Sequence, residues 1–333
     1  MADEQLQAVK EACNGMAVGI YRDLAVGASP SGAETWSNPE VMVPMAEVGA
    51  PPDILNTSGQ NWVLPPFHPH KMREDGYRSF IALVRTNMRH AGGLRIDHAM
   101  ALLRLYWVPS GNDAKEGVYV HYPIEDLVGI LALESQRNHC LVIGEDMGTV
   151  PEGFRERMAE ARVLSYRLLF FERDDKAFHA ARNYPLLALA VAGSHDLPTL
   201  RGWWQEGDIA AKERLGMLPG EDGPEKSRAE RQQDREALVA RLREEGLLDT
   251  EDGMPDLDTF CYAASRFLGR TRSLLTLLQI DDLTEECEQV NIPGAPGEHP
   301  NWRRRLSLTL EEIQTNPRVL QAVKDVQKER AGS

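Results

Sequence analysis

The stretch Gly-Leu-Arg-Ile-Asp-His, residues 93–98, sets the fold expected for this chain, because an acidic residue directly follows a short apolar run. Two further stretches repeat the arrangement, Leu-Val-Ile-Gly-Glu-Asp at 141–146 and Val-Ala-Gly-Ser-His-Asp at 191–196. A carboxylate in this position lies at the C-terminal end of a strand, which is where β/α barrels build their sites. The pattern therefore predicts parallel strands whose ends carry Asp97, Glu145 and Asp196.

Apolar strands alternate with helical segments along the chain, which is typical of a parallel sheet covered by helices. Six strands are expected, starting near residues 16, 94, 141, 164, 187 and 273. We therefore expect an α/β fold of the (β/α)8 TIM-barrel type that is N-terminally truncated, with about six of its eight strands. The whole chain, 1–333, is expected to form one partial barrel domain. An irregular cleft loop is expected over residues 27–70 and a helical insertion over about 206–270.

The charge and composition of the chain limit the kinds of molecule that it can bind. The formal net charge is −14 and the pI about 5.2. Such a surface repels phosphate, which argues against nucleic acid and anionic lipid but is compatible with a neutral sugar. The four cysteines form no C-x-x-C pair and no zinc spacing, and neither a signal peptide nor an apolar run of 18 residues occurs. We therefore expect a cytoplasmic protein with no metal, no cofactor and no membrane contact.

Carboxylates at strand ends have a known use in glycoside chemistry. Retaining cleavage needs two carboxyl groups about 5 Å apart, one as the nucleophile and the other as general acid and base. A third carboxylate can hold sugar hydroxyls as positive charge develops on the ring. Three carboxylates at the mouth of one barrel meet that need, so the pattern favours an enzyme that acts on glycosidic bonds.

Each neighbouring residue also has an ordinary structural interpretation. Arg95 lies two residues before Asp97, so on a strand both point the same way, as an ion pair that serves either the fold or the site. His195 could donate to a substrate hydroxyl or simply belong to a loop. Trp62 is either a core aromatic or a binding residue. Asp146 precedes Gly148-Thr149, and we expect it to cap a helix.

Several segments resemble the signature segments of the amylomaltases, the 4-α-glucanotransferases of the α-amylase clan. The three that carry the carboxylates are Gly-Leu-Arg-Ile-Asp-His-Ala-Met (93–100), Ile-Gly-Glu-Asp-Met-Gly-Thr-Val-Pro (143–151) and Ser-His-Asp-Leu-Pro-Thr-Leu-Arg-Gly (194–202). Others are Tyr-Arg-Asp-Leu-Ala-Val-Gly (21–27), Gly-Ala-Pro-Pro-Asp-Ile-Leu (49–55), Gly-Gln-Asn-Trp-Val-Leu-Pro-Pro (59–66) and Val-Asn-Ile-Pro-Gly…Asn-Trp-Arg-Arg (290–304). Val63 stands where the family usually has Gly, and Ser194 where Thr is usual.

The resemblance implies a role for each site residue. Asp97 would be the nucleophile, Glu145 the general acid and base, and Asp196 the stabiliser of the transition state. The substrate-binding residues would be Arg95, His195, Asp23, Asp53, Trp62 and Asn301. The implied reaction moves a 4-α-glucan segment from one malto-oligosaccharide to another sugar, without metal or nucleotide.

The expected lack of two barrel strands leaves alternatives open. An open barrel exposes strand edges, so we expect self-association or a complementing chain. The chain is then an active glucanotransferase, or a catalytically impaired remnant that still binds glucan. A retaining α-glucan hydrolase is a third alternative, because hydrolysis and transfer share the first chemical step.

Overall fold

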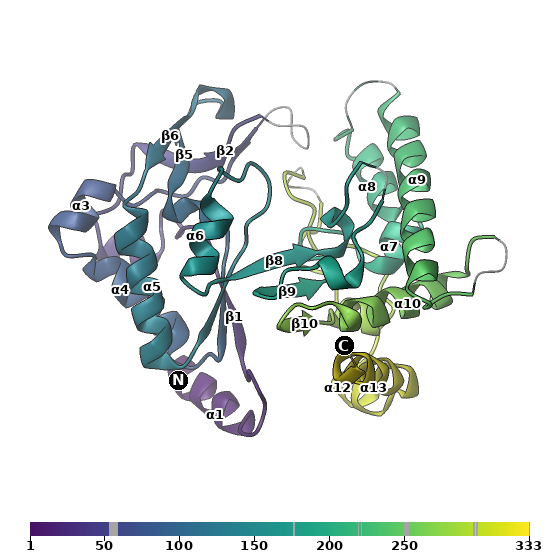
Figure 1. Ribbon diagram of the computed structural model, residues 1–333. Helices are drawn as coiled ribbons and strands as arrows, with labels where there is room; N and C mark the ends of the chain where they lie inside the picture. Colours follow the sequence, from purple (N-terminus) through teal and green to yellow (C-terminus); the bar gives the residue numbers. More distant parts are fainter. Residues whose placement is uncertain are drawn as a thin grey trace. The chain divides into compact units, whose positions relative to one another are not determined.

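The computed structural model describes residues 1–52, 59–175, 177–218, 220, 222–249, 253–295, 297 and 299–332 (Figure 1). Contacts between Cα atoms divide the chain into two compact units, Met1–Tyr166 and Arg167–Ser333. Each unit has its own cluster of buried apolar side chains. The two units are therefore described separately.

A parallel sheet forms the centre of the first unit, with the strand order β1-β4-β7-β8. All four residues of β4 are buried, as expected for a strand of a covered parallel sheet. The pairing register places Asp23 opposite Arg95 and Ile96 opposite Gly144. The strands are β1 (Tyr21–Leu24), β4 (Gly93–Ile96), β7 (Leu141–Gly144) and β8 (Leu164–Leu168).

The first strand begins later than its apolar sequence predicts. We expected it over residues 16–20, but β1 starts at Tyr21. Gly19 has a φ of 75°, which is incompatible with an extended strand and delays the start of pairing. As a result, Asp23 lies on the strand itself instead of following it, and its side chain comes level with β4.

A second, antiparallel sheet has two of its four strands in the segment that we expected to be irregular. Its order is β3-β2-β5-β6, and β2 pairs along its length with β5. The irregular stretch expected at 27–70 therefore includes paired strands, and β2 pairs with β5, more than 50 residues away in the sequence. The strands are β2 (Ala46–Ala50), β3 (Gln60–Asn61), β5 (Arg104–Pro109) and β6 (Val118–His121).

Helices cover the parallel sheet of the first unit, and α4 and α5 pack against each other. Their apolar faces join β4 in one core that contains Val84, Leu94 and Leu131, all fully buried. The α-helices of this unit are α1 (Ala2–Ala12), α2 (Ala33–Ser37), α3 (Pro69–Glu74), α4 (Arg78–Met88), α5 (Ile124–Asn138) and α6 (Phe154–Glu160). Short 3-10 turns follow β4 and β5, at Ala99–Leu102 and Ala114–Glu116.

The second unit contains the parallel pair β9 (Ala188–Val191) and β10 (Leu275–Leu277). Between them, where the sequence predicts a helical insertion over about 206–270, lie α8, α9 and α10. The core of the unit is built on α10, where Phe260, Ala264 and Phe267 are fully buried. The helices are α7 (Leu200–Trp204), α8 (Gly207–Arg214), α9 (Gly223–Glu244), α10 (Leu257–Arg270), α11 (Ile280–Leu283), α12 (Leu310–Thr315) and α13 (Pro317–Gly332), with 3-10 turns at Leu169–Phe171 and Ala181–Asn183.

The α/β fold with helices between parallel strands is therefore confirmed, and the described residues contain the six parallel strands expected. The carboxylates singled out in the sequence follow β4, β7 and β9, as the barrel pattern requires. In the described part of the chain, no helix combines the length and the hydropathy needed to cross a bilayer.

Candidate active site

Arg95 is the central cation of the first unit's acidic cluster. One of its terminal nitrogens pairs with Asp97 at 2.8 Å, and the other contacts both carboxylate oxygens of Asp23, at 2.7 and 2.8 Å. The Arg95 side chain is buried, and its guanidinium lies over the ring of Tyr166, 5.3 Å from the centroid. Burial disfavours the charged guanidinium, but the carboxylates of Asp97 and Asp23 outweigh that effect and raise the pKa of Arg95. The predicted Arg95–Asp97 ion pair is confirmed. Arg95 also forms an ion pair with Asp23, so the cluster has three members.

Glu145 follows β7 directly and is held by backbone amides. Its Oε2 accepts a hydrogen bond from the amide of His98, and its Oε1 accepts one from the amide of Met147, both at 2.9 Å. Burial raises the pKa of Glu145 to about 7, against the opposing charge of Arg95 and with the support of Asp97. A carboxyl group with such a pKa can both donate and accept a proton near neutral pH.

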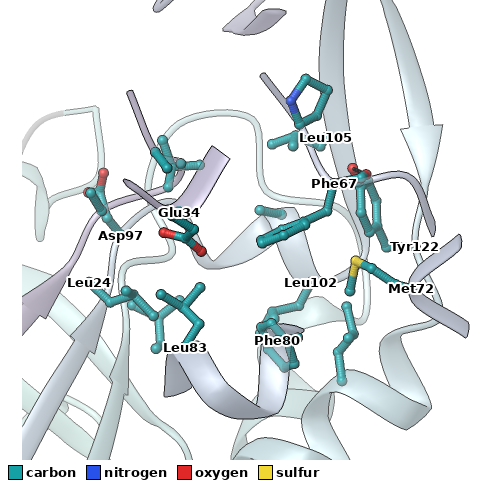
Figure 2. Close-up of a pocket in the computed structure, with 18 of the residues that line it drawn as sticks. Leu24, Glu34, Phe67, Met72, Phe80, Leu83, Asp97, Leu102, Leu105 and Tyr122 are labelled. Carbon is teal, nitrogen blue, oxygen red and sulfur yellow. Dashed lines mark hydrogen bonds between the residues drawn. The ribbon is translucent and has the colours of Figure 1, made fainter. Parts of the chain in front are cut away.

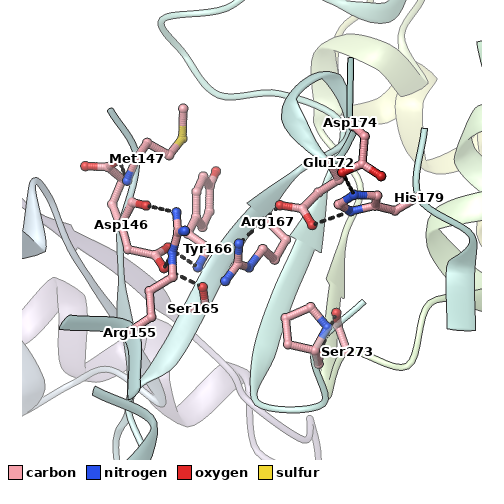
Figure 3. A network of polar contacts seen from close by, with 12 residues as sticks. Asp146, Met147, Arg155, Ser165, Tyr166, Arg167, Glu172, Asp174, His179 and Ser273 are labelled. Carbon is pink, nitrogen blue, oxygen red and sulfur yellow. Dashed lines mark hydrogen bonds and ion pairs between the residues drawn. The ribbon is translucent and has the colours of Figure 1, made fainter. Parts of the chain in front are cut away.

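Asp146 does not cap a helix, so that prediction was wrong. Its carboxylate accepts hydrogen bonds from Nε of Arg155 at 2.8 Å, from the hydroxyl of Ser165 at 2.7 Å and from the amide of Tyr166 at 3.2 Å (Figure 3). The next helix, α6, starts only at Phe154. Asp146 therefore ties the end of β7 to β8 and α6, and this anchors the backbone that carries Glu145.

Trp62 lies beside the same cluster. Its indole contacts the His98 ring edge-on, with the centroids 5.4 Å apart, and its Nε1 donates to Gln60 at 3.0 Å. Val63, which follows it, has a φ of 58°, a region that glycine adopts without strain and a β-branched residue rarely enters. The place that is usually Gly in the resembled family is thus a left-handed position in this chain.

The second unit holds the third carboxylate. Asp196 accepts a hydrogen bond from Nδ2 of Asn291 at 2.5 Å, and its main-chain carbonyl accepts one from Gln289 at 2.8 Å. His195 lies 3.3 Å from Asp196, measured between Nε2 and Oδ2, and its ring faces Trp302 at 5.2 Å. This cluster therefore presents an acceptor, an imidazole and an indole together.

Asn301 serves the backbone of its own loop. Its side chain accepts from the amide of Ile292 at 2.9 Å and donates to the carbonyl of Ile292 at 3.2 Å. Those two bonds join Asn301, the residue before Trp302, to Ile292. Asp53, the remaining predicted binding residue, lies outside the described residues.

A cavity of about 300 Å³ adjoins Asp97 in the first unit (Figure 2). Figure 2 shows Glu34 pointing into it, among the apolar side chains of Leu24, Leu83 and Phe67. Burial raises the pKa of Glu34. A mostly apolar lining offers few partners to sugar hydroxyls, so we do not assign this cavity to a glucan.

Sequence reasoning overlooked several residues that shape the site. Tyr166 stacks on Arg95, and the amides of His98 and Met147 hold Glu145. His98 stands inside the deciding stretch, so its position next to Asp97 was the available signal. Among the residues that the structure describes, no three His, Cys, Asp or Glu side chains are arranged to hold a metal ion.

The fold and the strand-end carboxylates define an α/β protein of the barrel type with an acidic site, the class to which many glycoside-processing enzymes belong. The family described as 4-alpha-glucanotransferase matches residues 1–310. The chain belongs to this family.

Proteins similar to this chain are described as 4-alpha-glucanotransferases or amylomaltases. A 4-alpha-glucanotransferase of Haemophilus influenzae is 39% identical over 323 residues, which are 95% of this chain and 46% of that protein. One from Mycobacterium tuberculosis is 38% identical over 331 residues, covering 96% and 45%. The crystal structure of an amylomaltase from Corynebacterium glutamicum superposes with a TM-score of 0.92 at 33% identity, over 98% of this chain and 48% of that one. An amylomaltase from Streptococcus agalactiae in complex with acarbose shares the fold, with a TM-score of 0.76 at 20% identity, over 98% and 60%. The chain spans about half the length of the curated relatives it matches.

Proposed function

We propose that the chain carries the catalytic carboxylates of a 4-α-glucanotransferase, which transfers 4-α-glucan segments between malto-oligosaccharides by retaining double displacement. The observation that carries the proposal is the contrast between Asp97 and Glu145. Asp97 is ion-paired with Arg95, whereas Glu145 has a pKa raised to about 7. A carboxylate beside a protonated carboxylic acid is the pair that retaining chemistry needs.

The first displacement forms a glycosyl-enzyme. An oxygen of Asp97 attacks the anomeric carbon of the donor, and the bond between that carbon and the glycosidic oxygen breaks. Glu145 transfers its proton to the departing oxygen, which leaves as the 4-hydroxyl of the released sugar. Glu145 is then a carboxylate, steadied by Arg95 and by the amides of His98 and Met147.

The second displacement returns the enzyme to its starting state. Glu145 removes the proton from the 4-hydroxyl of an acceptor sugar, whose oxygen attacks the anomeric carbon. The bond to Asp97 breaks, so Asp97 is again a carboxylate and Glu145 is again protonated. Two inversions give net retention at the anomeric carbon.

The remaining predicted residues are proposed to bind and stabilise the glucan. Asp196 would stabilise the oxocarbenium-like transition state, and its neighbour His195 would donate to sugar hydroxyls. Trp302, which is 61% exposed, offers an indole face to a sugar ring beside His195. The further substrate-binding residues are Arg95, Asp23, Asp53, Trp62 and Asn301, of which Arg95 and Asp23 act through their ion pairs.

Incubation of the purified chain with maltotriose tests the proposal. We expect glucose together with a ladder of longer malto-oligosaccharides, resolved by chromatography. Asp97→Asn should lower the rate by about three orders of magnitude or more, with an unchanged circular dichroism spectrum.

Other product patterns favour the alternatives. Unchanged maltotriose would contradict an active transferase, and retained glucan binding would then identify an impaired remnant. Glucose and maltose without longer products would identify a hydrolase. Recovery of the ladder on adding a second chain would support a complementing partner, which we propose together with self-association.

A further inference from the structure

Glu145 is hydrogen-bonded at three points to the end of β4 and to the turn that follows it. Its amide donates to the carbonyl of Ile96 at 3.0 Å, and its carbonyl accepts from the amide of Ala99 at 2.8 Å. Its Oε2 accepts from the amide of His98 at 2.9 Å. The end of β4 and the turn that bears Asp97 therefore hold both the backbone and the side chain of Glu145.

His98 makes this arrangement possible through an unusual backbone conformation. Its φ of 47° and ψ of 59° lie in the left-handed region, which residues other than glycine seldom adopt. Reversal of the chain at this single residue points its amide toward Glu145, while the 3-10 turn beginning at Ala99 continues the chain. Such strain persists only where the surrounding structure holds it in place.

Contacts of the His98 ring hold this backbone conformation in place. The ring meets the Trp62 indole edge-on at 5.4 Å. Trp62 is itself attached to the second sheet, because its amide donates to the carbonyl of Val48 at 2.9 Å. Burial lowers the pKa of His98, against the charge of Asp97.

We propose that His98 is a positioning residue: its left-handed backbone, held by the ring against Trp62, presents the amide that fixes the Glu145 carboxylate relative to Asp97. The catalytic meaning of this role depends on the proposed function, but the hydrogen bond can be tested without it. His98 acts through Glu145 and needs no contact of its own with the glucan.

Several charges and hydrogen bonds besides the His98 amide act on the Glu145 carboxylate. Arg95 on β4 favours its ionised form, and Asp97 beyond the same strand disfavours it. Asp146, next in the chain, is directed instead into the contacts with Arg155 and Ser165. Loss of the His98 amide would therefore leave Arg95 and the Met147 amide as the stabilisers of the carboxylate, and the pKa of Glu145 would rise.

Two substitutions of His98 separate backbone from side chain. His98→Asn and His98→Val both remove the imidazole, but asparagine enters the left-handed region readily and valine does not. Carbon-13 labelling of glutamate carboxyl groups allows the Glu145 signal to be followed by NMR, assigned by its absence in Glu145→Gln. We expect the Asn variant to titrate within about 0.3 pH unit of the unaltered chain. The Val variant should titrate about one unit higher, as expected for loss of a charge-assisted hydrogen bond.

A second measurement needs no substitution at His98. In the unaltered chain, the amide proton of residue 98 should shift with the same midpoint as the Glu145 carboxyl, and this titration should vanish in Glu145→Gln. If His98→Val does not fold, this titration of the amide proton tests the positioning role on its own.

The outcomes separate the two proposals. Equal titrations of the Asn and Val variants, or a residue-98 amide that ignores Glu145, would overturn the positioning role even if the maltotriose ladder forms. The expected titrations without a ladder would overturn the proposed function and leave the positioning role standing.

Discussion

At Glu145, burial and the charge of Asp97 favour the protonated carboxyl group, while Arg95 and two backbone amides favour the carboxylate. Their balance gives a pKa of about 7 and places proton exchange in the physiological range. The same strand end carries Asp146, which lies among hydrogen-bond donors and anchors neighbouring elements. Two adjacent acidic residues thus differ in role because their side chains meet different surroundings.

The raised pKa of Glu145 predicts the pH dependence of transfer. The first displacement needs the protonated acid, so kcat/KM should be level below pH 6 and fall as the pH rises through about 7, toward about tenfold per unit. Initial rates with maltotriose between pH 5 and 9 would measure this. A fall of about tenfold per unit that is already present at pH 5, as the ordinary value of 4.5 for glutamate would give, would contradict it.

The same group affects stability, which gives a control independent of activity. The folded-state pKa exceeds the unfolded value, so the stabilisation is fully present below about 4.5 and is lost as the pH rises through about 7. Urea denaturation across this window should show a loss of stability that is smaller in Glu145→Gln.

Val63 predicts a stabilising substitution. Its φ of 58° costs a side chain with Cβ about 1–2 kcal/mol, whereas glycine adopts this conformation freely but loses about 0.5–1 kcal/mol through its greater unfolded-state entropy. The Val63 side chain is 55% exposed, so little packing is lost. We expect Val63→Gly to stabilise the chain by about 0.5–1 kcal/mol in urea denaturation. Val63→Ala keeps the strain and is the control; equal effects of Gly and Ala would disprove the explanation.

At the scale of elements, the sequence predicts the strands that depend on a local pattern and misses those that depend on pairing with distant segments. Strands β4, β7 and β9 lie where short apolar runs precede a carboxylate, because burial on both faces demands such runs. Strands β2 and β5 were missed, since they pair with each other across more than 50 residues, and nothing local to residues 27–70 reveals that pairing. Likewise, Gly19 moved the start of β1 through one backbone angle that composition does not disclose.

Thr199 predicts the cost of losing a buried helix cap. Its hydroxyl accepts from the amide of Gly202 at 3.0 Å, in the first turn of α7, and donates to the carbonyl of Glu286 at 2.7 Å. Thr199→Ala removes the cap and leaves a buried carbonyl without its donor, so we expect a loss of about 2 kcal/mol in unfolding free energy. Thr199→Ser retains the hydroxyl and should lose less than half as much. An Ala variant as stable as the Ser variant would rule out the cap as the cause.

At the scale of the whole molecule, each of the two units has its own core, and β1 is the outermost strand of the first unit's parallel sheet. In the described residues, β1 pairs with β4 alone. An unpaired strand edge is a template for association through main-chain hydrogen bonds. The proposed self-association has its physical basis here.

Light scattering after size-exclusion chromatography tests that expectation. The chain has a mass of 37.2 kDa, and we expect the measured mass to exceed this value and to increase with protein concentration. Main-chain pairing carries no net charge, so moderate salt should not reverse it, whereas dilution should. A constant 37.2 kDa over a hundredfold range of concentration would contradict self-association.

The sequence by itself determined the α/β pattern, the strand-end carboxylates, the Arg95–Asp97 pair and the resemblance to the glucanotransferase family. The strand ends and the ion pair depend on residues a few positions apart, whose directions follow from the geometry of a strand, and the α/β pattern and the resemblance are sums of such local segments. Only the tertiary structure decided the pKa of Glu145, the role of Asp146, the second sheet and the left-handed turn at His98. Those properties arise where segments distant in the chain meet, because burial, opposing charges and backbone strain are set by neighbours in space.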